Sequence, residues 1–274
     1  MQKSLHGGIR PRLAVVGGPS QPVRQEIRVP ARHNPLLLRI VERVNADVEL
    51  WTLWKCANVN SVERLGNSDH GWVHVQIVAN LGLKLLRLLM DAGVQPGIVQ
   101  HHGLGRDEAE VVVVLGALLH DLGICVHQEE HERHSLFLAQ MKLRDLLADC
   151  CDVATRTVLF AEALHTVIAH RWDVQPFTRE AGVVKVADAL DMTKGRTRTA
   201  ALPPLSGPIA MIEAVEVHRG QTRPAAVEVV VASSVGIQQL EDLLLRQFQT
   251  SGIQDYLELS VRVAPDVTPP VPRP

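Results

Sequence analysis

The sequence predicts a mainly α-helical protein, with an all-α domain followed by a small α+β unit. Apolar residues make up 46% of the 274 residues, which is enough for a sizeable core. Aromatic residues make up only 3%, so Leu, Val and Ala must fill that core, which favours helices. The pattern is helical from residue 34 to about 202, and it changes to short β-branched runs after "LPPLSGP".

The first domain is predicted over residues 33–204. "NPLLLRIVERVNADVELWTLWKCANV" indicates one or two helices, with Asn34 as N-cap and Pro35 at the first helical position. "DHGWVHVQIVANLGLKLLRLLMDAG" predicts a long amphipathic helix that Gly93 ends. The valines of "RDEAEVVVVLGALLHDLG" also suit a buried strand, but the length, the acidic first turn and Gly123 favour a helix. Three further helices are expected near residues 129–149, 153–171 and 179–193.

The second unit is predicted over residues 205–264. "AVEVHRG", "AAVEVVVAS" and "YLELSVRV" are typical of strands, and "GIQQLEDLLLRQFQTSG" is typical of a helix. These segments predict a β-β-α-β arrangement. Residues 1–32 hold six Lys or Arg against one Glu, which predicts a flexible basic leader. The Pro-rich residues 265–274 predict a disordered or extended tail.

Composition excludes several classes of protein. The net charge of −2 argues against a dedicated nucleic-acid-binding protein. The four cysteines form no C-x-x-C pair, so free thiols in a reducing cytoplasm are expected. No run of eighteen apolar residues and no signal-peptide core is present, so we expect a cytoplasmic protein without a membrane span.

Histidines are concentrated in the helical region. Ten of the thirteen fall between His70 and His170. Neutral imidazoles and carboxylates are the usual nitrogen and oxygen ligands of divalent first-row metals. Histidines and carboxylates on apolar helices also need partners, because an unpaired buried polar group is costly. The cluster therefore predicts a metal site.

The order of these residues is informative. His74 lies in an apolar helix, His120 and Asp121 follow in "LLHDLG", and Asp188 lies in "VVKVADALD". This series resembles the HD-domain superfamily of metal-dependent phosphohydrolases, over roughly residues 65–200. The resemblance implies an all-α fold and implies His74, His120, Asp121 and Asp188 as the primary metal ligands.

The residue types suit hydrolysis at phosphorus. The adjacent His-Asp pair directs two different ligands into one space, and Asp121 has two oxygens with which to bridge two metals. Two metals about 3.5–4 Å apart can activate a water and stabilise an in-line displacement. We therefore expect one or two divalent ions, with Asp121 as the catalytic residue. The ligand set does not distinguish Mn, Fe, Co, Ni, Zn and Mg.

Family members with two metals supply extra histidines between the HD pair and the last Asp. His170 resembles one of these ligands, and it is preferred to His165, which lies about 140° away around the same helix. The other comes from "HQEEHERHS", where His127, His131 and His134 would share one helical face. The resemblance favours His131, with His134 and His127 as alternatives.

A rival motif occupies the same segment. "HQEEH" matches the H-x-x-E-H signature of inverted zinc peptidases, with His127 and His131 as ligands and Glu130 as base. Glu162 would supply the further carboxylate. This interpretation leaves His74, the His-Asp pair and Asp188 unexplained, so we rank it far lower.

Basic residues near the predicted site complete the sequence-based hypothesis. Phosphate groups need cationic donors, and the candidates are Lys185, Arg171, Lys194, Arg196 and Arg198. The predicted function is a phosphomonoesterase or phosphodiesterase that acts on a nucleotide-like small molecule. A nucleotide-binding regulatory domain with little turnover is the alternative. We expect no membrane or nucleic-acid partner, and a homodimer is compatible with the sequence.

Overall fold

The computed structural model describes residues 25–191, 212–233 and 237–264, apart from the side chains of Gln239 and Leu243. Several predictions lie outside these residues. They are the leader up to residue 24, the tail from residue 265, the boundary at residues 204–205, and the basic residues Lys194, Arg196 and Arg198.

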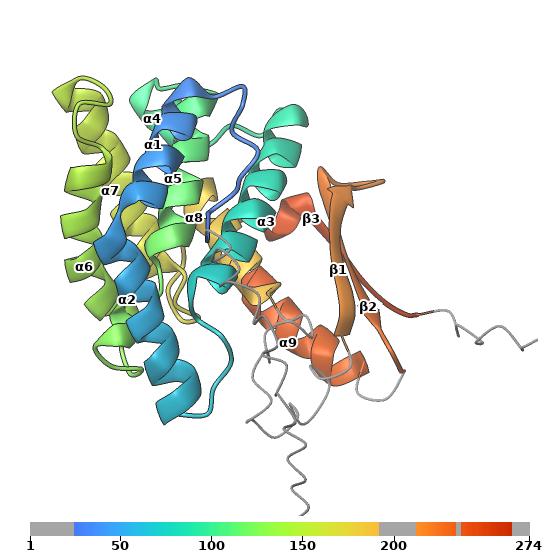
Figure 1. The fold of residues 1–274 in the computed structure, drawn as a ribbon. Helices are drawn as coiled ribbons and strands as arrows, with labels where there is room; N and C mark the ends of the chain where they lie inside the picture. Colours follow the sequence, from blue (N-terminus) through green and yellow to red (C-terminus); the bar gives the residue numbers. More distant parts are fainter. Residues whose placement is uncertain (1–24, 192–211, 234–236, 265–274) are drawn as a thin grey trace, which may run out of the picture.

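The first domain is helical throughout the described residues, as predicted (Figure 1). The predicted single or double helix after Asn34 is two helices followed by a π-helical turn, η1 (Val59–Arg64). A short 3-10 turn, η2 (Leu122–Cys125), separates the fifth helix from the sixth. The α-helices are α1 (Pro35–Ala46), α2 (Val48–Asn58), α3 (Trp72–Asp91), α4 (Gly97–His102), α5 (Arg106–Leu119), α6 (His131–Leu146), α7 (Val153–Ala169) and α8 (Arg179–Ala189).

The helix ends follow the signals in the sequence. Asn34 caps α1 by accepting a hydrogen bond from the amide of Leu37, with Pro35 at the first helical position. Gly93, with φ of 85°, follows the end of α3 in a left-handed conformation that favours glycine. His101 and His102 form the last turn of α4. Both side chains are exposed there.

Helix α5 is the centre of the helical domain. Every residue from Ala109 to Leu119 is buried, because α3, α7 and α8 pack around it (Figure 1). The valine run is therefore a core helix and not a strand. By length and composition α3 could cross a membrane, and it is the one such helix among the described residues. Its packing against α5 and α8 accounts for its apolar character.

The C-terminal unit has the predicted β-β-α-β order. It consists of β1 (Ile212–Arg219), β2 (Ala225–Val231), α9 (Ile237–Gln249), a 3-10 turn η5 (Gln254–Tyr256) and β3 (Leu257–Val263). The sheet has the order β1-β2-β3, with β1 antiparallel and β3 parallel to β2. Helix α9 makes the crossover that a parallel pair requires. Strand β1 packs against α3 and α9 against α8, so both units share one hydrophobic cluster.

The end of the predicted leader is ordered by packing. Ile27 and Ala31 are each 1% exposed. The side chain of Asn45 accepts a hydrogen bond from the amide of Ile27 and donates one to its carbonyl. The prediction of flexibility is therefore wrong for residues 25–32, because apolar side chains within this basic stretch reach the core.

Candidate metal centre

The His120–Asp121 pair lies where α5 ends. His120 is fully buried, and its Nδ1 donates a hydrogen bond to the carbonyl of Ala117 at 2.8 Å. The backbone then turns sharply into η2. A Cβ atom on Gly123 would lie 2.0 Å from the carbonyl oxygen of His131, so glycine allows η2 to pack tightly against the start of α6. The amide of Gly123 also donates to the hydroxyl of Ser135 at 2.8 Å.

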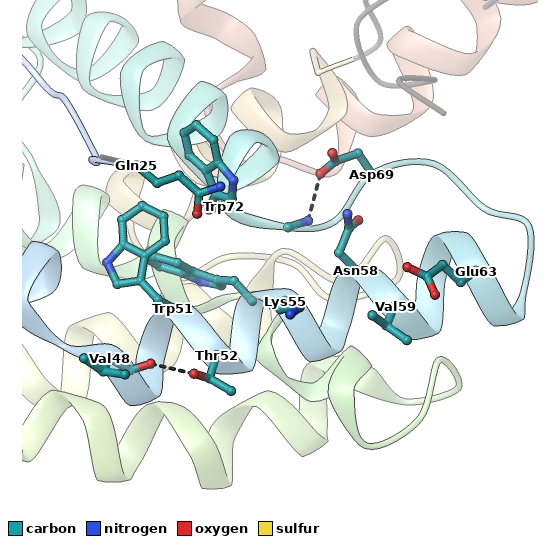
Figure 2. A pocket seen from close by; sticks show the side chains of 12 residues that line it. Gln25, Val48, Trp51, Thr52, Lys55, Asn58, Val59, Glu63, Asp69 and Trp72 are labelled. Atoms are coloured by element: carbon teal, nitrogen blue, oxygen red, sulfur yellow. Dashed lines mark hydrogen bonds between the residues drawn. The ribbon is translucent and has the colours of Figure 1, made fainter. Parts of the chain in front are cut away.

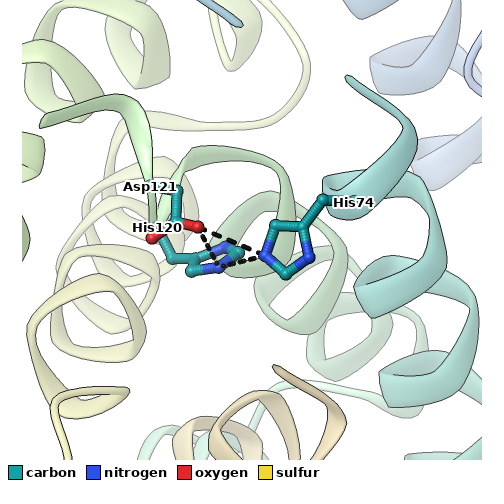
Figure 3. Close-up of side chains that lie close together, drawn as sticks. All are labelled: His74, His120 and Asp121. Carbon is teal, nitrogen blue, oxygen red and sulfur yellow. Dashed lines mark hydrogen bonds and ion pairs between the residues drawn. The ribbon is translucent and has the colours of Figure 1, made fainter. Parts of the chain in front are cut away.

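His74 reaches the pair from α3 (Figure 3). Its Nε2 lies 3.2 Å from Oδ2 of Asp121 and 3.2 Å from Nε2 of His120. Oδ1 of Asp188, from α8, lies 3.3 Å from Nε2 of His74 and 3.7 Å from Nε2 of His120. Three helices therefore direct these four side chains into one space.

Two further histidines face the other oxygen of Asp121. Nε2 of His131, the first residue of α6, lies 3.2 Å from Oδ1 of Asp121. Nε2 of His170, just after α7, lies 3.7 Å from the same oxygen and 3.3 Å from Nε2 of His131. The Asp121 carboxylate thus lies between two groups of imidazoles, with a different oxygen facing each.

The six predicted ligands form three overlapping groups of three residues, and within each group the ligand atoms lie within 4.8 Å of one another. The groups are His74, His120 and Asp121; His120, His170 and Asp188; and Asp121, His131 and His170. Two ligands that each lie about 2.0–2.2 Å from one ion are separated by roughly 3–3.5 Å. The observed separations of 3.2–3.7 Å therefore fit a divalent ion with little rearrangement.

The Nδ1 atoms of the four histidines are all held by the protein. Nδ1 of His74 donates to Asp191 at 2.7 Å, and His120 donates to Ala117. Nδ1 of His131 and of His170 donate to the carbonyls of Gln128 and Val167, at 3.0 and 2.6 Å. Each ring therefore presents Nε2 to the centre, which is how outer hydrogen bonds orient metal-binding histidines. Sequence reasoning missed Asp191, although it closes the quoted segment "VVKVADALD".

The electrostatics of the cluster favour a cation. Burial raises the pKa of Asp121, but neighbouring His120, His131 and His74 hold it well below its usual value. Burial lowers the pKa of His120, but Asp121 and Asp188 raise it to about 9. Burial and repulsion from His120 lower the pKa of His170 to about 4. The carboxylates therefore stay ionised and attract positive charge into a buried space.

The structure separates His131 from its alternatives. His127 is exposed, and its Nδ1 accepts a hydrogen bond from the amide of Glu129. Helix α6 begins only at His131, and Glu130 before it has a positive φ of 54°. The prediction that three histidines share one helical face is therefore wrong for His127. His134 is not in any of the three groups.

The peptidase hypothesis fails for the same reason. It needs His127 and His131 on one helix, and only His131 is helical. Its proposed carboxylate ligand, Glu162, instead accepts from Nε2 of His102 at 3.1 Å. His165 also lies outside the cluster. Its Nε2 accepts a hydrogen bond from the amide of Phe177, and its ring stacks on the ring of that residue.

Lys185 does not have the position expected of a phosphate ligand. It is 1% exposed, and its ammonium donates to the carbonyls of Arg171, Trp172 and Val174 at 3.0, 3.2 and 2.7 Å. All three donors therefore hold the loop after His170, which leaves none for a substrate. The side chain of Arg171 is 25% exposed, and its Nε donates to Asp173.

Comparison with known proteins identifies the class that this fold and site define. The family model of the HD domain matches residues 73–193, a span that contains all six clustered ligands. The chain belongs to the HD-domain family, whose members bind divalent metals. It is also 35% identical over 216 residues to an uncharacterized protein of Methanocaldococcus jannaschii, which covers 77% of this chain and 83% of that protein.

Proposed function

We propose that this protein is a metal-dependent phosphohydrolase that cleaves a phosphate ester or anhydride of a nucleotide-like substrate. One observation carries the proposal. Oδ2 of Asp121 faces His74 and His120, whereas Oδ1 faces His131 and His170. A carboxylate in this position suits two ions, and two-ion sites are typical of in-line displacement at phosphorus.

His74, His120 and Asp188 would hold one ion, His131 and His170 would hold the other, and Asp121 would contact both. When bound, the ions would polarise the phosphoryl group and lower the pKa of a water. The protein contributes preorganised ligands that are largely buried, where charges interact more strongly than in water. Asp188, with 26% of its side chain exposed, marks the side of the cluster that is open to solvent.

Cationic groups are expected to orient the phosphate. Arg171 follows a ligand directly and retains donors beyond the Nε that contacts Asp173. Lys194 and Arg196, which follow the last ligand helix in the sequence, complete the proposed set. The proposal also includes a cytoplasmic location, and it is compatible with a homodimer.

The experiment is a hydrolysis screen with nucleotides, phosphomonoesters and cyclic phosphodiesters in the presence of Mn²⁺. Wild-type protein should release phosphate or cleave a diester, and Asp121→Ala should abolish this turnover. Asp145→Ala changes an exposed carboxylate near the opposite end of α6 from His131, so it should retain full activity. Arg171→Ala should mainly raise KM, because the side chain would bind phosphate both before and during the reaction.

Two results would contradict the proposal. If Asp121→Ala keeps wild-type turnover, the metal cluster is not the source of the activity. If the wild type binds a nucleotide tightly but hydrolyses no member of the screen, the chain is a nucleotide-binding regulatory domain.

A further inference from the structure

A hollow of about 560 Å³ lies between α2 and the segment that enters α3 (Figure 2). None of the six clustered metal ligands lines it. Three of the four tryptophans of the chain, Trp51, Trp54 and Trp72, lie on its wall. Its volume falls within the range of small-molecule sites, roughly 300–1,000 Å³.

The tryptophans form a fixed aromatic wall. The ring centroids of Trp51 and Trp54 are 5.1 Å apart at an interplanar angle of 84°, and those of Trp51 and Trp72 are 5.7 Å apart. Nε1 of Trp54 donates to the carbonyl of Leu118, and Nε1 of Trp51 donates to that of Val44. Trp54 is 1% exposed and supports the ring of Trp51 from within the core. Trp51 and Trp72 are half-buried, so these two rings offer carbon surface to the hollow.

Hydrogen-bond donors and acceptors also line the hollow (Figure 2). Oδ1 of Asn58 accepts from the amide of His70, which directs the donating amide nitrogen elsewhere. Oδ1 of Asp69 accepts from the amide of Gly71 and leaves Oδ2 as a further acceptor. Lys55 and Glu63 are exposed and line the same hollow. The hollow therefore combines an aromatic surface with both donors and acceptors.

We propose that this hollow binds the base of a nucleoside or nucleotide, at a site separate from the metal centre. A nucleobase has an apolar π-face and carries donors and acceptors in the plane of its ring, which matches both parts of the wall. Stacking on aromatic side chains contributes about 1–3 kcal/mol per base. A purely apolar ligand would leave the remaining donors and acceptors of Asn58 and Asp69 unused. An organic cation would be attracted by Asp69 and Glu63, so the titration below includes spermidine to distinguish it from a base.

The test is a fluorescence titration of the full chain with adenosine, guanosine and cytidine. These probes carry no phosphate, so hydrolysis at the metal centre does not affect the result. The protein carries Trp172→Phe, which leaves the three tryptophans of the hollow as the fluorophores. Trp172 is 69% exposed, so this background should fold normally. We expect saturable quenching by at least one nucleoside.

A matched pair of variants locates the binding. Thr52 lines the hollow and is exposed, with its hydroxyl donating to the carbonyl four residues earlier at 2.7 Å. Thr157 on α7 is exposed and makes the same bond at 2.7 Å, but it does not line this hollow. Thr52→Arg should weaken binding about tenfold or more by filling the site, and Thr157→Arg should leave it unchanged.

Three outcomes would overturn the inference. They are no saturable quenching by any nucleoside, equal binding by both arginine variants, and saturation by spermidine without saturation by nucleosides. None of these outcomes bears on the metal centre, because neither the ligands of the cluster nor phosphate takes part in the titration.

Discussion

The Nδ1 hydrogen bonds decide which atom each histidine offers to a metal. Asp191 is the carboxylate that accepts a hydrogen bond from one of these Nδ1 atoms, whereas the other three histidines donate to backbone carbonyls. The carboxylate of Glu132 lies farther away, 3.7 Å from Nδ1 of His131. A carboxylate makes the imidazole more basic and fixes its tautomer. His74 should therefore depend on Asp191 both for its orientation and for its affinity as a ligand.

Replacing Asp191 should weaken metal binding without removing a ligand. Asp191→Asn keeps an acceptor for Nδ1 of His74 but removes the charge, so we expect affinity to fall about tenfold or more. Competition with a chelator measures the effect. Asp145→Asn, which changes an exposed carboxylate, is the control. Equal affinity of Asp191→Asn and wild type would show that Asp191 does not support the site.

Metal binding should also release a proton. Without metal, Asp121 and Asp188 overcome the effect of burial and raise the pKa of His120 to about 9, so this ring is charged at pH 7. His170, with a pKa of about 4, is already neutral there. A metal binds only the neutral ring, so metal binding at pH 7 should release about one proton from His120.

The affinity for metal should increase with pH. Because the proton competes with the metal for His120, affinity should rise from pH 7 and level off above about pH 9. Calorimetry in buffers of different ionisation enthalpy counts the released protons. His127→Asn, which changes an exposed histidine outside the cluster, should not alter the count. A pH-independent affinity would refute this charge assignment.

At the scale of elements, Lys185 joins α8 to the loop after α7. Its ammonium holds three carbonyls of that loop, next to the ligand His170. Sequence spacing placed Lys185 one turn before Asp188 and suggested a phosphate ligand. Spacing could not show that the loop turns its carbonyls toward α8, because that depends on tertiary packing.

Lys185→Met should destabilise the fold by about 1–3 kcal/mol, because it removes a buried ammonium that holds three partly buried carbonyls of the loop. Urea unfolding measures the loss. Lys55→Met, at an exposed position on α2, should change stability by less than about 0.5 kcal/mol. A loss for Lys185→Met no larger than that of Lys55→Met would contradict the structural role of Lys185.

The elements most accurately predicted from sequence are those with long periodic patterns and clear caps. Helix α3 and the Asn34 cap of α1 are examples. Helix α4 was missed because its six residues lie between glycines and are too few to show a period. Residues 25–32 were misjudged because their buried apolar side chains alternate with charged ones.

At the scale of the molecule, five helices or helix ends supply the cluster from positions far apart in the sequence. Residues 74 and 188 lie on α3 and α8, which pack against α5 and against each other. Sequence order and family resemblance indicated this set of residues. Neither could indicate that one oxygen of Asp121 faces His74 and His120 while the other faces His131 and His170. That arrangement depends on the orientation of the Asp121 side chain, which only the three-dimensional structure gives.

Anomalous X-ray diffraction from a crystal grown with Mn²⁺ tests the two-ion centre most directly. We expect two peaks about 3.5–4 Å apart, with Asp121 between them. One should lie beside His74 and His120, and the other beside His131 and His170. A single peak within the cluster would contradict the two-ion account, and peaks elsewhere with none at Asp121 would contradict the metal centre itself.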